Sequence, residues 1–302
     1  MLQTSRVQVE KIRRGNVPSS SRRLRRPAGL VAAFSCTFLL NSVGNGLESN
    51  WATSLGCLAI LLLGLPHGSL DLAVMRKRTG VNEQQIAAII MIYLGFAGSM
   101  ALVWHIAPVG ALAVFLAIAC VHFAEDWLPD QLPFFAIGTA TAVLTAPALL
   151  HYRQLSDIFV KLTGNATASM LADFTLLVAP VALITAIVGI TLACRQGRSI
   201  AAIESATILC SMVLLPPVIG FAVFFCLAHS PRHFAAAKAE LSFGSRRLNC
   251  EIGLLTFAAM GIAALIYIFR NSGLQGDGVI AASFVTLSIL TVPHMIVPRF
   301  FL

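Results

Sequence analysis

Apolar runs of about 18 residues or more recur along this chain from residue 28 onward, and short polar breaks separate them. Wound as a helix, a run of this length spans the hydrocarbon core of a bilayer. Charged residues make up 11% of the chain, whereas soluble domains carry about 25%. The sequence therefore predicts an all-α fold, a polytopic helical bundle integral to a membrane, with no separate soluble domain between the runs.

The basic residues are concentrated before the first apolar run. Eight of the 21 Lys and Arg residues stand within residues 1–26, and without them the formal net charge would be zero instead of +8. Basic residues before a first span mark the cytoplasmic side of a membrane, so this charge does not indicate a nucleic-acid partner. We predict a basic, disordered cytoplasmic tail at 1–27 and a single transmembrane domain at 28–302.

The predicted spans follow the apolar runs. They cover residues 28–47, 52–75, 84–106, 109–128, 131–151, 171–194, 199–235, 250–270 and 278–297. The run at 199–235 is too long for one comfortable span of about 20 residues and barely long enough for two. Pro216 and Pro217 near its middle cannot donate helical hydrogen bonds, so they could mark a turn between two helices.

Charge favours two spans within 199–235. Two spans return the loop with Lys238, Arg246 and Arg247 to the cytoplasmic side, whereas one span would place these cations outside. We therefore predict about ten transmembrane helices, within a range of about eight to ten, and a cytoplasmic N-terminus.

Five of the seven histidines are predicted to lie at one depth in the membrane. His105 and His151 stand beside aromatic residues at predicted helix ends, where amphipathic rings favour the interface. The others lie roughly 12 to 17 residues into spans that run toward the cytoplasm, a depth spread of about 8 Å at about 1.5 Å per residue. These five are His67, His122, His229, His233 and His294. We expect them to meet in one layer, in the cytoplasmic half of the bilayer.

Polar partners stand one helical turn from three of these histidines. Four residues separate the members of each pair: His67 and Asp71, His122 and Asp126, and His229 and His233. Members of such a pair can share a helical face. A carboxylate at the centre of a membrane helix costs roughly 2.5 to 3.5 kcal/mol, so Asp71 and Asp126 are expected to serve a function.

Imidazoles from several helices indicate a metal site. Nitrogen ligands without thiolate suit iron, copper, zinc or nickel, and nearby carboxylates could orient the rings by accepting their second N–H, or could ligate themselves. The alternative is that the histidines are hydrogen-bonding groups between helices. Pro66 and Pro293 each stand directly before a histidine, and Pro231 stands between His229 and His233. We expect each proline to interrupt the ideal helix, which is tolerated where backbone lines an enclosed cavity.

Aromatic residues flank the same histidines in the sequence. Phe123, Trp127, Phe225 and Phe234 are the candidates for lining a site for a large apolar ligand. The competing explanation is ordinary packing or lipid contact, which is the usual role of phenylalanine side chains in a membrane protein.

Four motifs carry a resemblance to a known family. They are LPHGSLD at 65–71, HFAEDW at 122–127, CLAHSPRH at 226–233 and VPH at 292–294. In this order and spacing they resemble the Brp/Blh family, the bacteriorhodopsin-related-protein-like β-carotene 15,15'-dioxygenases, over about residues 30 to 300. PHG-x-x-D together with H-S-x-R-H is the specific part of the resemblance.

The resemblance implies an integral membrane enzyme that uses Fe²⁺ and O₂ to split β-carotene at its central double bond into two molecules of all-trans-retinal. By motif, it implies that iron is held by His67, His122, His229 and His233. His294 would be a further ligand or line the site, and Asp71 and Asp126 would support the ligands. The implied setting is a bacterial inner membrane, with β-carotene, O₂ and lipid as partners and a functional link to a retinal-binding rhodopsin.

Three other classes of protein stay open. A membrane di-iron desaturase or hydroxylase uses several HxxxH and HxxHH clusters, whereas this chain has one HxxxH. A metal or proton transporter would also bury His and Asp, but would spread polar groups through the membrane depth. A non-catalytic carotenoid- or retinal-binding accessory protein would keep the fold without turnover.

Overall fold

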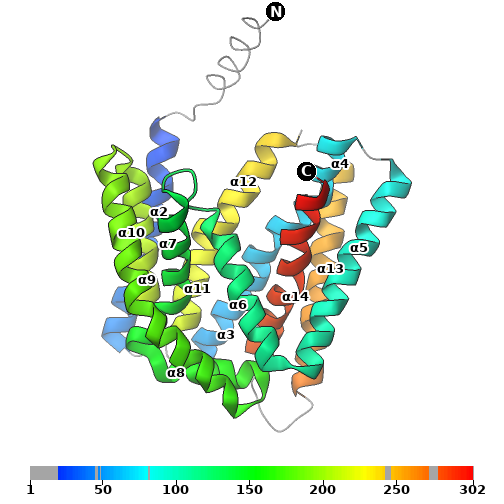
Figure 1. Cartoon of the computed structure of the whole chain (residues 1–302). Coiled ribbons are helices and arrows are strands. Elements are labelled where there is room, and N and C mark those ends of the chain that lie inside the picture. Colours follow the sequence, from blue (N-terminus) through cyan, green and yellow to red (C-terminus); the bar gives the residue numbers. More distant parts are fainter. Residues whose placement is uncertain are drawn as a thin grey trace, which may run out of the picture.

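The computed structural model describes residues 20–44, 47, 49–80, 82–241, 246–271 and 278–301. Within these ranges every regular element is a helix, as predicted (Figure 1). The longer helices are α2 (Ser20–Gly44), α3 (Asn50–Ala59), α4 (Asp71–Thr79), α5 (Glu83–Ile106), α6 (Pro108–Ala124), α7 (Pro133–Thr145), α8 (Pro147–Thr163), α9 (Ser169–Arg195), α10 (Ser199–Leu214), α11 (Pro217–Phe224), α12 (Ser230–Glu240), α13 (Arg246–Asn271) and α14 (Gly278–Phe301). Residues 1–19 of the predicted tail lie outside the described residues, and α2 begins at Ser20, within that tail.

Four short elements complete the list. The π-helices are η2 (Ile60–Gly64) and η5 (Phe225–His229), and the 3₁₀-helices are η3 (Leu65–Leu70) and η4 (Ala166–Ala168). η2 and η3 join α3 to α4, and η5 joins α11 to α12. The consecutive helices α3 to α4 form one irregular rod, and α11 to α12 form a second. Among the described residues, six helical segments are long and apolar enough to cross a membrane, and the number is seven if the pair α7 and α8, bent by 49°, counts as one span.

The predicted count of about ten spans is not confirmed. Three predicted spans correspond to shorter apolar helices, at Pro27–Ser42, Pro108–Ala124 and Ser199–Leu214. The break predicted within 199–235 is present: α10 ends at Leu214 and α11 begins at Pro217. The two helices pack closely, because a Cβ on Gly220 would lie 2.7 Å from the Ser211 carbonyl oxygen.

Basic residues gather at the end of the bundle where α4 meets α12. This end, called the basic end below, carries Arg76, Lys77 and Arg78 in the last turn of α4. The C-terminal end of α14 lies at the same end in Figure 1, and α8 lies at the opposite end. Arg78 donates to both carboxylate oxygens of Glu240 at the end of α12, at 2.5 and 2.7 Å. The irregular rods α3–α4 and α11–α12 are therefore joined at this end by an ion pair.

Each π-helix comes just before a proline. Pro66 follows η2 by two residues, and Pro231 follows η5 by two residues. Proline has no N–H to donate and its ring clashes with the carbonyl four residues earlier, so a wider turn before it relieves both problems. The interruptions predicted at Pro66 and Pro231 are present.

The interruption predicted at Pro293 is wrong, because α14 continues through it. The Tyr93 hydroxyl donates to the Leu290 carbonyl in the same turn at 3.4 Å. Side-chain donors of this kind let a membrane helix accommodate a proline without breaking.

Ser230 connects the two irregular segments. Its hydroxyl donates to the Leu63 carbonyl at 2.9 Å and lies 3.2 Å from the Gly64 carbonyl, both in η2. The segments approach closely there, since a Cβ on Gly64 would lie 2.2 Å from the Phe225 ring. Ser230, which is 4% exposed, therefore satisfies η2 carbonyls where the two segments pack together.

Replacing Ser230 with alanine is expected to lower the stability of the folded protein by about 1 to 3 kcal/mol, because buried carbonyls would lose their donor. Thermal unfolding in detergent measures the effect. Ser99→Ala is the matched control, since the exposed Ser99 hydroxyl bonds within its own helix to the Gly95 carbonyl. Equal melting temperatures for the two variants would contradict this role of Ser230.

Candidate metal centre

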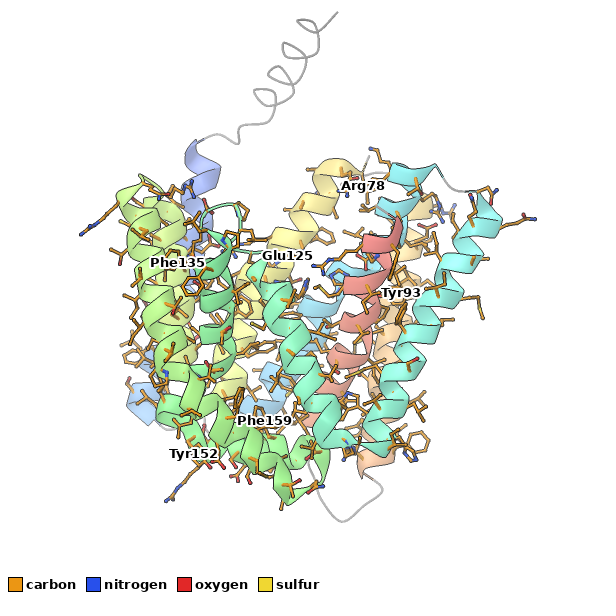
Figure 2. The ribbon with its side chains drawn as sticks, in the orientation of Figure 1. Arg78, Tyr93, Glu125, Phe135, Tyr152 and Phe159 are labelled. Atoms are coloured by element: carbon orange, nitrogen blue, oxygen red, sulfur yellow. The ribbon has the colours of Figure 1, made fainter. Side chains whose placement is uncertain are left out.

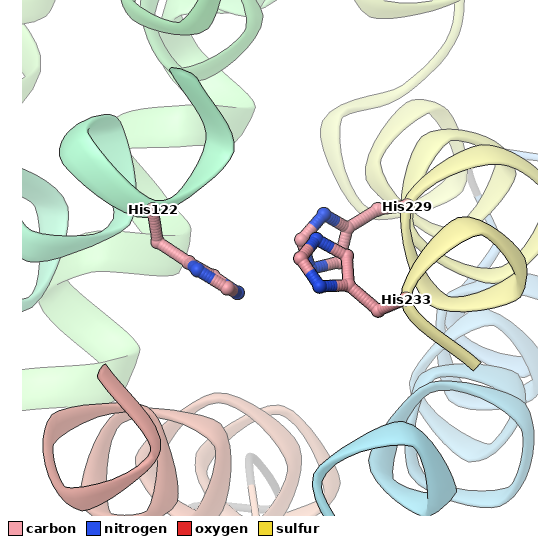
Figure 3. Close-up of side chains that lie close together, drawn as sticks. All are labelled: His122, His229 and His233. Carbon is pink, nitrogen blue, oxygen red and sulfur yellow. The ribbon is translucent and has the colours of Figure 1, made fainter. Parts of the chain in front are cut away.

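Three histidines from two separate parts of the chain converge inside the bundle. The candidate ligand atoms of His122, His229 and His233 all lie within 4.8 Å of one another (Figure 3). We call this set the histidine cluster. His122 is 4% exposed and His229 is fully buried, whereas the His233 side chain is 27% exposed.

Local structure brings the cluster together. His122 stands in the last turn of α6, His229 ends the π-helix η5, and His233 follows in the first turn of α12. Although Pro231 lies between them, the rings of His229 and His233 face each other with centroids 4.4 Å apart. The His122 ring lies 4.8 Å from that of His229 and 5.3 Å from that of His233.

The Asp126 carboxylate orients two rings of the cluster. It accepts a hydrogen bond from Nδ1 of His229 at 2.8 Å and lies 3.3 Å from Nε2 of His233. Its side chain is 2% exposed, so burial of its charge is compensated by these partners. The sequence spacing predicted that Asp126 shares a helical face with His122, and this pairing is wrong. α6 ends at Ala124, and the chain turns there, so Asp126 faces the other two histidines.

An arginine and a glutamate extend this network, and sequence reasoning missed both. Arg232 lies 3.7 Å from the Asp126 carboxylate and forms an ion pair with Glu204 of α10 at 2.9 Å. Signals for both were present, because Arg232 stands inside the HSPRH motif and Glu204 is a charge within an apolar run. The network ties α10 to the segment that carries His229 and His233.

A second imidazole and carboxylate pair lies beside the cluster. Nδ1 of His294 donates to Asp71 at 2.5 Å, and the His294 ring lies edge-on to that of His122, 5.1 Å away. His294 is not one of the three clustered residues. Asp71, predicted as a partner of His67, therefore has His294 as its described partner, from the other end of the chain.

The His67 side chain lies outside the described part of the structure. Its backbone belongs to η3, and the next residue, Gly68, faces His294: a Cβ there would lie 3.7 Å from Nδ1. η3 therefore borders the same region as His294 and Asp71, while ligation by His67 stays a prediction.

An apolar cavity of about 200 Å³ adjoins the cluster. His122 and His294 stand on its wall, together with Phe123 and Phe225, two of the aromatic residues predicted to line a site. The Phe225 ring stacks on the His229 ring with centroids 5.3 Å apart. α5, α13 and α14 contribute most of the remaining wall, including Tyr93, whose position Figure 2 shows.

Trp127 and Phe234 are not among the described residues that line the cavity. The Trp127 indole N–H donates to Ser205 at 2.9 Å, and its ring stacks on that of Phe224. Phe234 packs against a small cluster that includes Leu70 and Leu248. Packing against other side chains therefore accounts for the positions of Trp127 and Phe234.

The chemistry of the cluster fits a divalent metal ion. Three neutral imidazoles are common ligands of iron, copper, zinc and nickel, and a carboxylate on the second ring nitrogen is the usual means of fixing the orientation of such ligands. His229 would then ligate through Nε2, because its Nδ1 is bonded to Asp126. The cluster can therefore hold an ion next to an apolar cavity.

Comparisons with known proteins agree on one family. The family model described as Beta-carotene 15,15'-dioxygenase matches residues 58–302. A beta-carotene 15,15'-dioxygenase of uncultured marine bacterium 66A03 is 29% identical over 255 residues, which covers 80% of this chain and 90% of that protein. A protein of Halobacterium salinarum named probable beta-carotene 15,15'-dioxygenase Blh is 28% identical over 278 residues, covering 78% of this chain and 80% of the relative. No solved structure matches the chain.

Proposed function

Because the chain belongs to the beta-carotene 15,15'-dioxygenase family, we propose that it is a membrane enzyme that cleaves β-carotene at the central 15,15' double bond. In this reaction each carbon of the broken double bond takes one oxygen atom of O₂, which gives two molecules of all-trans-retinal. The observation that carries the proposal is the histidine cluster, buried beside an apolar cavity in a chain of this family.

The cavity suits a hydrocarbon substrate. β-Carotene dissolves in the bilayer, and the described wall of the cavity is mostly aliphatic and aromatic, with Leu255, Ile262 and Leu287 among its residues. Such a wall would bind the polyene by burial of apolar surface and keep water from the reacting carbons. Phe225, stacked on His229, would position the chain of double bonds against the cluster.

The proposed metal is Fe²⁺, with His122, His229 and His233 as ligands and His67 as the fourth. When bound, a ferrous ion would donate to O₂ the electron density that O₂ needs in order to react with a polyene. Asp126 would hold the His229 and His233 rings in position, and Asp71 would hold the His294 ring. His294 would be a further ligand or part of the cavity wall.

The proposed setting is a bacterial inner membrane, with the N-terminus and the basic end in the cytoplasm, as the positive-inside rule favours. The three shorter apolar helices would complete about ten crossings. Release of retinal into the lipid would supply a retinal-binding rhodopsin.

Expression in a β-carotene-producing bacterium tests the proposed function. The cells are expected to lose their orange colour and to accumulate retinal, both of which chromatography measures. Coloured cells that contain folded, iron-loaded protein would contradict the proposal. Retention of unbroken carotenoid on the purified protein would then favour a binding protein, and metal flux into vesicles would favour a transporter.

A further inference from the structure

A second opening reaches the histidine cluster from the basic end. A crevice of about 190 Å³, called the polar crevice below, is lined by residues that include His233, His294 and Asp71. Asp71 and His294 also stand on the wall of the apolar cavity, so the two hollows meet at this pair. The proposed metal site can therefore be approached from two sides with different chemistry.

The outer end of the polar crevice lies at an ion pair. Arg78 and Glu240 line the crevice, and their side chains are 50% and 26% exposed, which places them at its mouth. Figure 2 shows Arg78 at the basic end, beside the end of α12. Lys77 donates to the Glu240 backbone carbonyl and holds the last turn of α12 in place. Asp71, His233 and His294 supply the other polar groups of the lining, and the remainder is apolar: Val74, Met75, Ala236, Ala237 and Pro298.

A divalent ion needs such a path. A hydrated cation loses a large solvation energy on entering hydrocarbon, so the apolar cavity that suits a polyene would exclude it. Carboxylate oxygens and imidazole nitrogens can replace part of its water along the polar crevice.

We infer that the polar crevice is the route by which a divalent cation reaches the histidine cluster, and that the Arg78–Glu240 ion pair sets the charge at its mouth. The inference rests on the proposed metal centre. It is independent of the reaction carried out there, because loading can be measured without carotenoid or O₂. Substrate and metal would thus enter by separate openings.

Opposite changes of charge at the mouth are expected to have opposite effects. Metal-free protein in lipid nanodiscs is mixed with Co²⁺, and the visible d–d absorption of the histidine-bound ion reports the rate of uptake. Glu240→Gln leaves the Arg78 cation uncompensated and should slow uptake about fourfold at low salt, whereas Arg78→Gln leaves the Glu240 carboxylate and should speed uptake about fourfold. Both effects should shrink as salt screens the charges.

The double variant Arg78→Gln/Glu240→Gln should return to the wild-type rate, because it removes one positive and one negative charge and so leaves the net charge at the mouth unchanged. Arg76→Gln and Glu251→Gln are matched controls, since these two residues form an ion pair at the basic end at 2.7 Å and do not line the crevice. Their rates should stay within about twofold of wild type, the smaller effect of a more distant charge.

A structural role of the ion pair predicts a different result, in which both single variants change uptake in the same direction and the double variant does not recover. That result, or unchanged rates, would overturn the route. Wild-type protein that binds no cobalt would overturn the metal centre itself, and with it the route. Rates that follow the predicted pattern in a protein without carotenoid cleavage would support the route while removing the proposed function.

Discussion

Replacing His229 with alanine is expected to abolish carotenoid cleavage and to lower the affinity for metal by at least about 100-fold, the upper range seen when a residue that merely supports a ligand is lost. His229 is fully buried, is held by Asp126 at 2.8 Å and is stacked by Phe225. Its ring is therefore confined to one orientation in the cluster. Cobalt titration of purified protein and colour loss in β-carotene-producing cells measure the two effects.

A second variant separates loss of the ligand from loss of the fold. His229→Gln keeps a donor for Asp126 and much of the side-chain volume, but removes the imidazole. We expect it to fold as the wild type does and to lose cleavage as His229→Ala does. His105→Ala changes an exposed histidine at the end of α5 and should keep the metal affinity and the carotenoid cleavage of the wild type. Cleavage by folded His229→Gln protein would contradict the assignment of His229 as a ligand.

Replacing Asp126 with asparagine is expected to weaken metal binding by about 10- to 100-fold and to destabilise the folded protein by about 3 kcal/mol. The carboxylate is 2% exposed and faces two imidazoles and the Arg232 guanidinium, so the amide would present donors to groups that themselves donate. Cobalt titration measures the affinity, and thermal unfolding in detergent measures the stability.

Asp130→Asn is the matched control for Asp126→Asn. Asp130 stands in the same connection between α6 and α7, only four residues later, and is partly exposed. It should bind cobalt and unfold as the wild type does. Wild-type cobalt affinity in the Asp126→Asn variant would show that the His229 and His233 rings do not depend on this carboxylate.

The membrane class and the candidate histidines could be predicted from the sequence because both depend on local properties. Long apolar runs specify membrane helices without reference to the rest of the chain. The depth of a residue in its span follows from its position along a regular helix, and the structure brings His122, His229 and His233 together as that reasoning expected. The turn at Pro216 could likewise be predicted, because proline restricts its own backbone.

The acidic partners could not be predicted from spacing. A separation of four residues implies a shared face only if the helix is regular across all four. α6 ends at Ala124, two residues before Asp126, and η3 gives way to α4 at Asp71. Each carboxylate therefore faces a histidine far away in the sequence, His229 for Asp126 and His294 for Asp71.

The sequence by itself determined that this protein is a bundle of helices long and apolar enough to cross a membrane, and which histidines could converge in it, because hydrophobicity and helical rise act along the chain. The tertiary structure alone decided which carboxylate holds which ring, that Glu204 and Arg232 extend the network, and that a polar crevice meets an apolar cavity at Asp71 and His294. These features depend on how irregular helix ends pack against distant segments. Contacts of that kind are decided only when the whole bundle is assembled.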